Sequence, residues 1–150
     1  MSGPLFEKYR SAMIGQTILH VWQIHGSTLF LECGDPDLPM RRDGLTEQPL
    51  GHYSVMIEGG WRIADGASIL FDRSGENDVS GIGQALTGGK IEDLRLAGNP
   101  PELSVHISGG IRVISAADGE QPGWRLFDRR SVPGAEIWIK FRDGDIREDR

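Results

Sequence analysis

The sequence contains little cysteine and no long apolar run. Cys33 is the single cysteine in 150 residues, so an internal disulfide is excluded and a reducing compartment is expected. Its position at the end of an apolar strand pattern predicts a small buried thiol. No run of roughly eighteen apolar residues occurs, as a membrane-spanning helix would need, and the N-terminal residues do not resemble a secretion signal. We therefore expect a soluble, cytoplasmic protein without a membrane partner.

Basic residues are fewer than acidic residues. The 16 Lys and Arg residues are outnumbered by 22 Asp and Glu residues, which gives a formal net charge of −6 at pH 7. Nucleic-acid binding depends on clustered Lys and Arg side chains that neutralise phosphates. The composition therefore predicts no nucleic-acid partner, and it favours solubility or a basic protein partner.

The residues that bind metals lack the required spacing. None of the four histidines is paired as His-x-His or His-x-x-x-His, and no second cysteine accompanies Cys33. In the acidic run that begins at Asp72, the sixth position of a calcium loop is Asn77 instead of glycine, and the twelfth is Gly83 instead of glutamate. We therefore expect no metal. The histidines are His20, His25, His52 and His106.

Motifs for phosphate binding and catalysis are incomplete. The glycine-rich segments 81–83 and 88–90 do not complete a Walker or dinucleotide-binding fingerprint. No nucleophile-elbow pattern occurs, and sequence order alone can neither supply nor exclude a base for Cys33 or a serine. The leading interpretation is a protein without a cofactor and without catalytic activity, and a hydrolase remains the less favoured alternative.

Glycine, proline and short alternating apolar runs are abundant. The 21 Gly and 8 Pro residues indicate many turns, as in small sandwiches and barrels. We predict a mainly β protein in which two pseudo-repeated antiparallel β meanders form one sandwich or partly open barrel. One or two short helices are expected, the first ending at Gly15 and the second including Ile82 and Leu86.

A weak internal repeat organises this pattern. Residues 14–22 are similar to residues 87–95, which lie 73 positions later. The most specific shared element is a Gly-Trp-Arg-aliphatic tetrad at 60–63 and at 123–126. Because the parts of each copy recur in the same order, the pattern predicts a duplicated β unit.

The repeat also predicts the domain organisation. We expect a single domain over residues 1–150, since two half-domains of this size would share one core. The first pseudo-repeat covers about 13–72 and the second about 85–142. Residues 15–65 and 88–128 are expected to superpose once their loops are removed.

The first strand of each copy has a predicted inner and outer face. Comparison of the two copies makes Val21 and Leu94 the expected core residues. The same comparison places His20, Trp22 and Ile24 on the more exposed face.

The four tryptophans fall into two groups. Trp61 and Trp124 occupy matching positions in the repeat and are expected in the core. Trp22 and Trp138 have no matching aromatic residue, and Trp138 is out of phase with the apolar alternation of the predicted strand 136–142. Both are candidates for a binding surface, and partial burial under a loop is the alternative for each.

An insertion distinguishes the first copy. Residues 34–51 occupy a gap that the second copy crosses with residues 108–110. The insertion contains several prolines and mixed charges, so we expect it to be irregular and exposed. Its acidic side chains, with two residues of the first strand, are the predicted partner-binding site. These residues are Asp35, Asp37, Asp43, Glu47, His20 and Trp22.

The glycine placement and aliphatic pattern of residues 13–18, 57–63 and 85–88 resemble an uncharacterised family of small bacterial proteins with a duplicated β repeat. The resemblance covers most of residues 13–128 and implies the same duplicated β fold. That family has no catalytic residues to transfer. Similar small acidic proteins include immunity proteins, which neutralise a toxin by binding it, and this likeness is one of class alone.

The leading functional hypothesis is therefore a non-enzymatic protein-binding module, of which an immunity protein for a basic toxin is a specific form. The main alternative is a small-ligand-binding β protein that holds its ligand between the two repeats. A deep apolar cavity with converging His or Asp side chains would favour that alternative.

Overall fold

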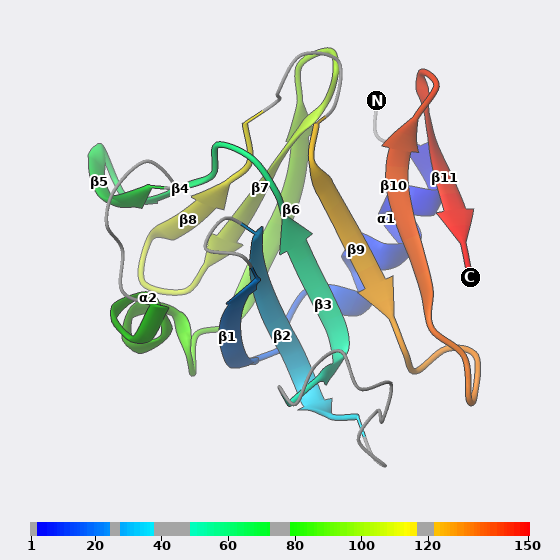
Figure 1. The fold of residues 1–150 in the computed structure, drawn as a ribbon, viewed down its shortest axis with the longest axis horizontal. Coiled ribbons are helices and arrows are strands. Elements are labelled where there is room, and N and C mark those ends of the chain that lie inside the picture. Colours follow the sequence, from blue (N-terminus) through cyan, green and yellow to red (C-terminus); the bar gives the residue numbers. More distant parts are fainter. Residues whose placement is uncertain (1–2, 25–27, 38–48, 73–78, 117–121) are drawn as a thin grey trace.

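The computed structural model describes residues 3–24, 28–37, 49–72, 79–116 and 122–150. These residues form two antiparallel sheets and two short helices (Figure 1), so the predicted mainly β fold is confirmed. The helices are α1 (Gly3–Met13) and α2 (Val79–Leu86). The strands are β1 (Ile18–Ile24), β2 (Thr28–Pro36), β3 (Gly51–Ile57), β4 (Arg62–Asp65), β5 (Ser68–Asp72), β6 (Ile91–Ala97), β7 (Glu102–Ile107), β8 (Ile111–Ile114), β9 (Trp124–Asp128), β10 (Ile137–Arg142) and β11 (Asp145–Asp149).

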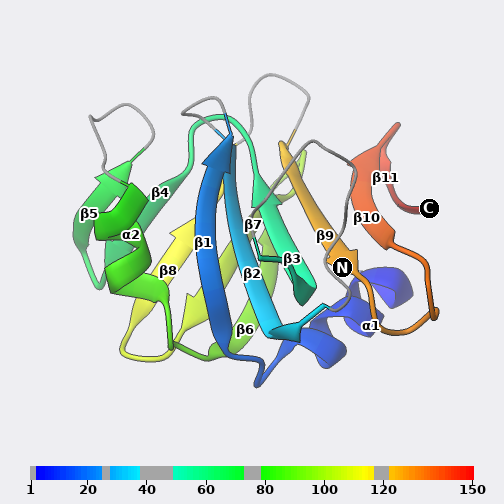
Figure 2. The same cartoon turned by 60° about the horizontal axis from the view of Figure 1, so that its bottom comes forward.

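Each half of the chain contributes strands to both sheets. The six-stranded sheet has the order β1-β2-β3-β9-β10-β11, and the five-stranded sheet has the order β5-β4-β8-β7-β6. The meander β1-β2-β3 is thus extended by β9 from the second half, whereas the meander β6-β7-β8 is extended by β4 from the first half. Figure 2 shows the two sheets as separate layers. The two halves are therefore joined by an exchange of strands.

Backbone hydrogen bonds where the two halves meet recur with a shift of 73 residues. They surround an isolated antiparallel bridge between Thr17 and Lys90. That residues 15–65 and 88–128 superpose along their whole length stays a prediction. The four bonds run from Gly15 N to Ile91 O (2.7 Å), from Gly88 N to Ile18 O (2.9 Å), from Ile18 N to Gly89 O (2.8 Å) and from Ile91 N to Gln16 O (2.9 Å).

Both helices end in the same way. α1 ends at Met13 and α2 at Leu86, and each is followed by a glycine with φ of 89°, Gly15 and Gly88. Glycine adopts this left-handed conformation without the steric cost that a Cβ brings. The chain can therefore leave each helix and enter the next strand within a few residues.

The core lies between the inner faces of the two sheets. Val21 and Leu94 are 6% and 1% exposed, so both predicted core positions are confirmed. Trp61 and Trp124 are 1% and 2% exposed, which confirms their predicted burial. The indole of Trp124 packs edge-on against Phe6, with ring centroids 6.3 Å apart.

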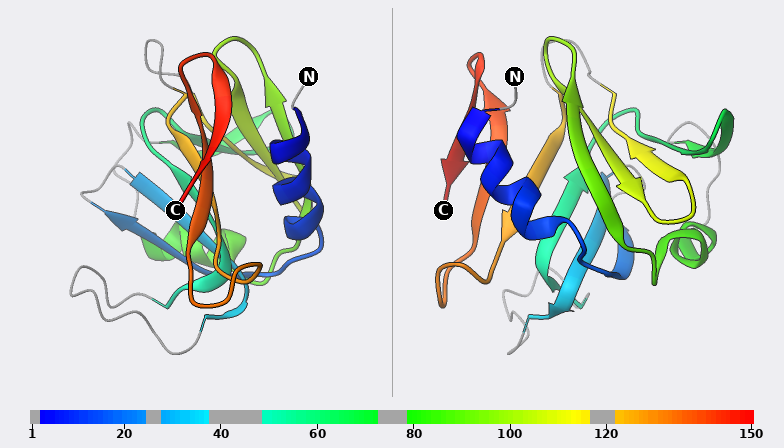
Figure 3. Two further views of the ribbon diagram at one scale, coloured as in Figure 1. Left: turned by 90° about the vertical axis from the view of Figure 1, so that its right-hand side faces the viewer. Right: turned by 180° about the vertical axis from the view of Figure 1, so that it is seen from behind.

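Helix α1 contacts an edge strand of each sheet, β11 in the six-stranded sheet and β6 in the five-stranded sheet (Figure 3). The hydroxyl of Tyr9 donates a hydrogen bond of 2.8 Å to Glu148 on β11. The guanidinium of Arg10 forms an ion pair of 2.7 Å with Asp93 on β6. Helix α2 packs beside β1. Neither helix is long and apolar enough to cross a membrane.

The ends of the predicted insertion at 34–51 are strands, which corrects the expectation of an irregular segment there. Gly34 to Pro36 continue β2, and Pro36 pairs with Gly51 at the start of β3. A Cβ on Gly51 would lie 2.4 Å from the carbonyl oxygen of Cys33, so only glycine fits this pairing. The rest of the insertion, 38–48, lies outside the described residues.

The thiol of Cys33 supplies a first test of the fold. Cys33 is fully buried, and burial, followed by the nearby charge of Glu32, raises its pKa. Because the thiolate is the reactive form, we expect a disulfide reagent such as dithionitrobenzoate not to label the folded protein. Labelling should reach one equivalent only after unfolding in urea. Rapid labelling in native buffer would contradict this burial.

Candidate functional site

The predicted partner-binding residues are not brought together into one exposed surface by the described structure. Asp35 is exposed at the end of β2, and Asp37 is half-buried, with its N–H donating to Leu50 O at 2.8 Å. His20 is half-buried on β1. Asp43 and Glu47 lie outside the described residues. The role of this set in partner binding stays a prediction.

Trp22 is buried, so the expectation of an exposed indole is wrong. Its side chain is 8% exposed and stacks on Phe30, with ring centroids 4.1 Å apart. Its indole N–H donates a hydrogen bond of 2.8 Å to Glu32. The alternation correctly placed Trp22 and Val21 on opposite faces of β1. It did not predict that the face bearing Trp22, the second face of the sheet, is buried as well.

A buried polar cluster surrounds Glu32 on this second face. The Glu32 side chain is fully buried. One carboxylate oxygen accepts the indole N–H of Trp22, and the other accepts the amide of Gly51 at 3.0 Å and the hydroxyl of Ser54 at 2.5 Å. These bonds satisfy a carboxylate that would otherwise be very costly to bury.

Arg129 compensates the charge of this carboxylate. Its side chain is 7% exposed, and Nη1 lies 3.4 Å from Glu32 and donates to the Ser54 hydroxyl at 2.6 Å. Nη1 also donates to the Gly51 carbonyl at 3.0 Å, and Nε donates to Glu136 at 2.7 Å. The cluster thus links β1, β2 and β3 to residues that follow β9. Its groups are paired with one another and buried, so we interpret it as a structural element.

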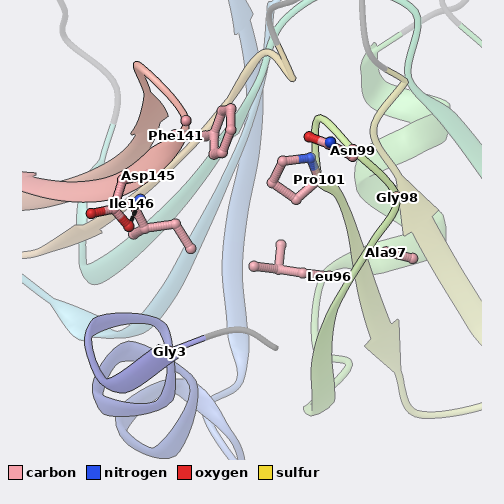
Figure 4. A pocket seen from close by; sticks show the side chains of 10 residues that line it. Gly3, Leu96, Ala97, Gly98, Asn99, Pro101, Phe141, Asp145 and Ile146 are labelled. Carbon is pink, nitrogen blue, oxygen red and sulfur yellow. Dashed lines mark hydrogen bonds between the residues drawn. The ribbon is translucent and has the colours of Figure 1, made fainter.

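A cleft with both apolar and polar lining opens at the edge where α1 joins the sheets (Figure 4). Its volume is about 320 Å³. The half-buried side chains of Leu96, Pro101, Phe141 and Ile146 point into it from β6, the β6–β7 hairpin, β10 and β11. The first residue of α1, Gly3, completes one wall. Four apolar side chains that are distant in sequence therefore share one open space.

More of the lining surface of the cleft is polar than apolar. Asn99 and Asp145 lie at its rim, and both are exposed. One carboxylate oxygen of Asp145 accepts the N–H of Ile146 at 2.8 Å. The described lining holds no histidine, cysteine, serine or lysine. Across the described ranges, no three His, Cys, Asp or Glu side chains gather in a way that could hold a metal ion.

Sequence reasoning missed this cleft. Phe141 continues the alternation of Ile137 and Ile139 in the predicted strand 136–142. Pro100 and Pro101 indicate a turn at 98–101. No local pattern relates Phe141 to Leu96. Their proximity depends on the placement of two hairpins from different sheets.

No protein family, no curated protein and no solved structure matches the chain.

Proposed function

We propose that this chain is a non-enzymatic binding module that accepts an apolar side chain of a basic protein partner in the cleft between Leu96, Pro101, Phe141 and Ile146. The observation that carries the proposal is the convergence of these four side chains on an open space. Leu96, Phe141 and Ile146 pack against the core with one part of their surface and leave another part available. Apolar side chains that converge on an open space can hold the anchoring side chain of a protein partner.

The lining supports binding over catalysis. General acid–base and nucleophilic catalysis need a base within hydrogen-bonding reach of a nucleophile. Asp145 is the ionisable side chain among the lining residues, and its carboxylate engages its own strand through Ile146. A hydrolase therefore has less support in this cleft than a binding module.

The size and charge of the protein favour a basic partner. A volume of about 320 Å³ is at the lower end of ligand pockets, which span roughly 300–1,000 Å³, and it suits one large side chain. The net charge of −6 would attract a basic surface over several ångströms. An immunity protein for a basic toxin is a specific form of this proposal. A small apolar ligand in the same cleft is the second candidate.

Charged substitutions in the cleft test the proposal. Leu96→Arg and Ile146→Arg should each weaken partner binding at least about tenfold, because they place a charge among the apolar side chains that would contact the partner. Calorimetric titrations would use the products of neighbouring genes and peptides selected from a random display library. Ile69→Arg is the matched control, since Ile69 is 51% exposed on β5 and outside the cleft.

Three outcomes distinguish the alternatives. Circular dichroism must first show that each variant is folded. Unchanged affinity in both cleft variants would contradict the proposal and direct attention to the predicted site at His20 and residues 34–51. Loss of binding to an apolar dye such as anilinonaphthalene sulfonate, without any protein partner, would favour the small-ligand alternative.

A further inference from the structure

A row of cationic side chains crosses three neighbouring strands of the six-stranded sheet. Arg125 on β9 is directly opposite Lys140 on β10, and Lys140 is directly opposite Arg147 on β11. The three strands are adjacent in Figure 1. Like charges in directly opposite positions destabilise a sheet. This arrangement is unexpected in a chain whose acidic residues outnumber its basic residues by 22 to 16.

The side chains of Arg125 and Lys140 are not ion-paired in the described parts of the chain, although the carboxylates of Glu58 and Asp143 line the same pocket. Neither side chain forms an ion pair or hydrogen bond with a described residue, although both are half-buried. Other arginines are paired: Arg10 with Asp93, Arg129 with Glu136, and Arg142 with Asp143. The cationic row is therefore a place where the fold retains repulsion that an anion would relieve.

A pocket lies over this row. It has a volume of about 360 Å³ and is lined by Arg125, Lys140 and Arg142. Buried Met56, which is opposite Arg125 on β3, also lines it. The carboxylates of Glu58 and Asp143 also line it, and Asp143 is paired with Arg142. The pocket thus combines two unpaired cations, Arg125 and Lys140, with the Arg142–Asp143 ion pair and a further carboxylate, Glu58. It is large enough for a small ligand.

A second donor on the same face also lacks an acceptor. The indole N–H of Trp138 is buried and has no hydrogen-bond partner among the described residues. Trp138 precedes Lys140 by two residues and therefore lies on the same face of β10. Buried donors are almost always satisfied, so its neighbourhood, like the cationic row, has more donors than acceptors.

We infer that the outer face of β9 and β10 binds a small polyanion that carries two or more carboxylate or phosphate groups. The planar guanidinium of Arg125 can bind one such group through two parallel hydrogen bonds, and Lys140 supplies a compact charge beside it. This pocket shares Phe141 with the cleft described above, but Arg125 and Lys140 lie outside that cleft. The inference does not rest on the function proposed for the cleft.

Pyrophosphate and citrate are the two probes, and they distinguish a phosphate from a carboxylate ligand. At constant ionic strength, we expect calorimetric titration to detect one site for at least one of them. Arg125→Gln and Lys140→Gln should each weaken binding about tenfold or more. Lys90→Gln removes the same charge outside the pocket and should leave the affinity within about twofold.

The ligand-free variants provide a second measurement. Because Arg125 and Lys140 repel each other, Lys140→Gln should raise the urea midpoint of the ligand-free protein or leave it unchanged. A lowered midpoint would mean that Lys140 stabilises the fold, and it would overturn the inference. Absence of binding by both probes, or an equal loss in Lys90→Gln, would also overturn it. Binding of poly-glutamate alone would assign the row to an acidic protein segment and overturn the small-ligand assignment.

Discussion

Arg129→Met should lower the free energy of unfolding by about 3–5 kcal/mol, because it leaves a buried carboxylate without its positive partner. Glu32 is fully buried, and the Arg129 side chain is 7% exposed. The substitution also removes the donor that holds the Ser54 hydroxyl at 2.6 Å and the Gly51 carbonyl at 3.0 Å. Urea denaturation followed by tryptophan fluorescence would measure the loss.

Two further variants separate the buried charge from the lost packing of the side chain. Glu32→Gln combined with Arg129→Met removes both charges and keeps an acceptor for Trp22 and Gly51, so it should recover a large part of the loss. Arg142→Met is the control, since Arg142 is 59% exposed and lies 3.7 Å from Asp143. We expect the control to change stability by less than about 0.5 kcal/mol. If Arg129→Met resembles the control, the cluster does not stabilise the fold.

Trp124→Ala should lower the free energy of unfolding by about 3–5 kcal/mol. The indole is 2% exposed, packs against Phe6, and donates a hydrogen bond of 3.0 Å to the carbonyl of Pro101. Truncation therefore opens a cavity and leaves that carbonyl without its partner. The loss can be measured by the shift of the urea midpoint at constant slope.

If the predicted duplication is correct, a similar effect is expected at a second position. Trp61 is 1% exposed and directly precedes β4, as Trp124 begins β9. Trp61→Ala should therefore cost about as much as Trp124→Ala. Ile69→Ala, at a position that is 51% exposed, should cost less than about 0.5 kcal/mol. A small effect at Trp61 alone would count against equivalent roles for the two tryptophans.

The features that the sequence predicted correctly depend on local patterns. Gly15 follows a short apolar periodicity and can adopt a positive φ, so the end of α1 was predictable. The alternation of Ile137 and Ile139, followed by Asp143-Gly144, predicted a strand and a tight turn. Asp143 and Gly144 indeed have φ of 52° and 79°.

The features that the sequence did not predict depend on distant pairs. Trp22 is buried with Glu32, and Glu32 is compensated by Arg129, which lies 97 residues later. The cationic row was also not predicted, because Arg125, Lys140 and Arg147 come from three strands. No local pattern determines the register of these strands. Leu96 and Phe141 share a cleft for the same reason. Alternation assigns a residue to a face of its strand, but it does not say what lies opposite.

The exchange of strands between the two halves has a consequence for synthesis on the ribosome. In β3, Tyr53 pairs with Asp128, which is translated 75 residues later. Until β9 emerges, the nascent β1-β2-β3 meander therefore presents β3 as an open edge with unpaired amide and carbonyl groups. A ribosome that stalls after the first half would expose an edge able to pair with other chains. Chaperone dependence of this protein should accordingly be greatest before the second half has been translated.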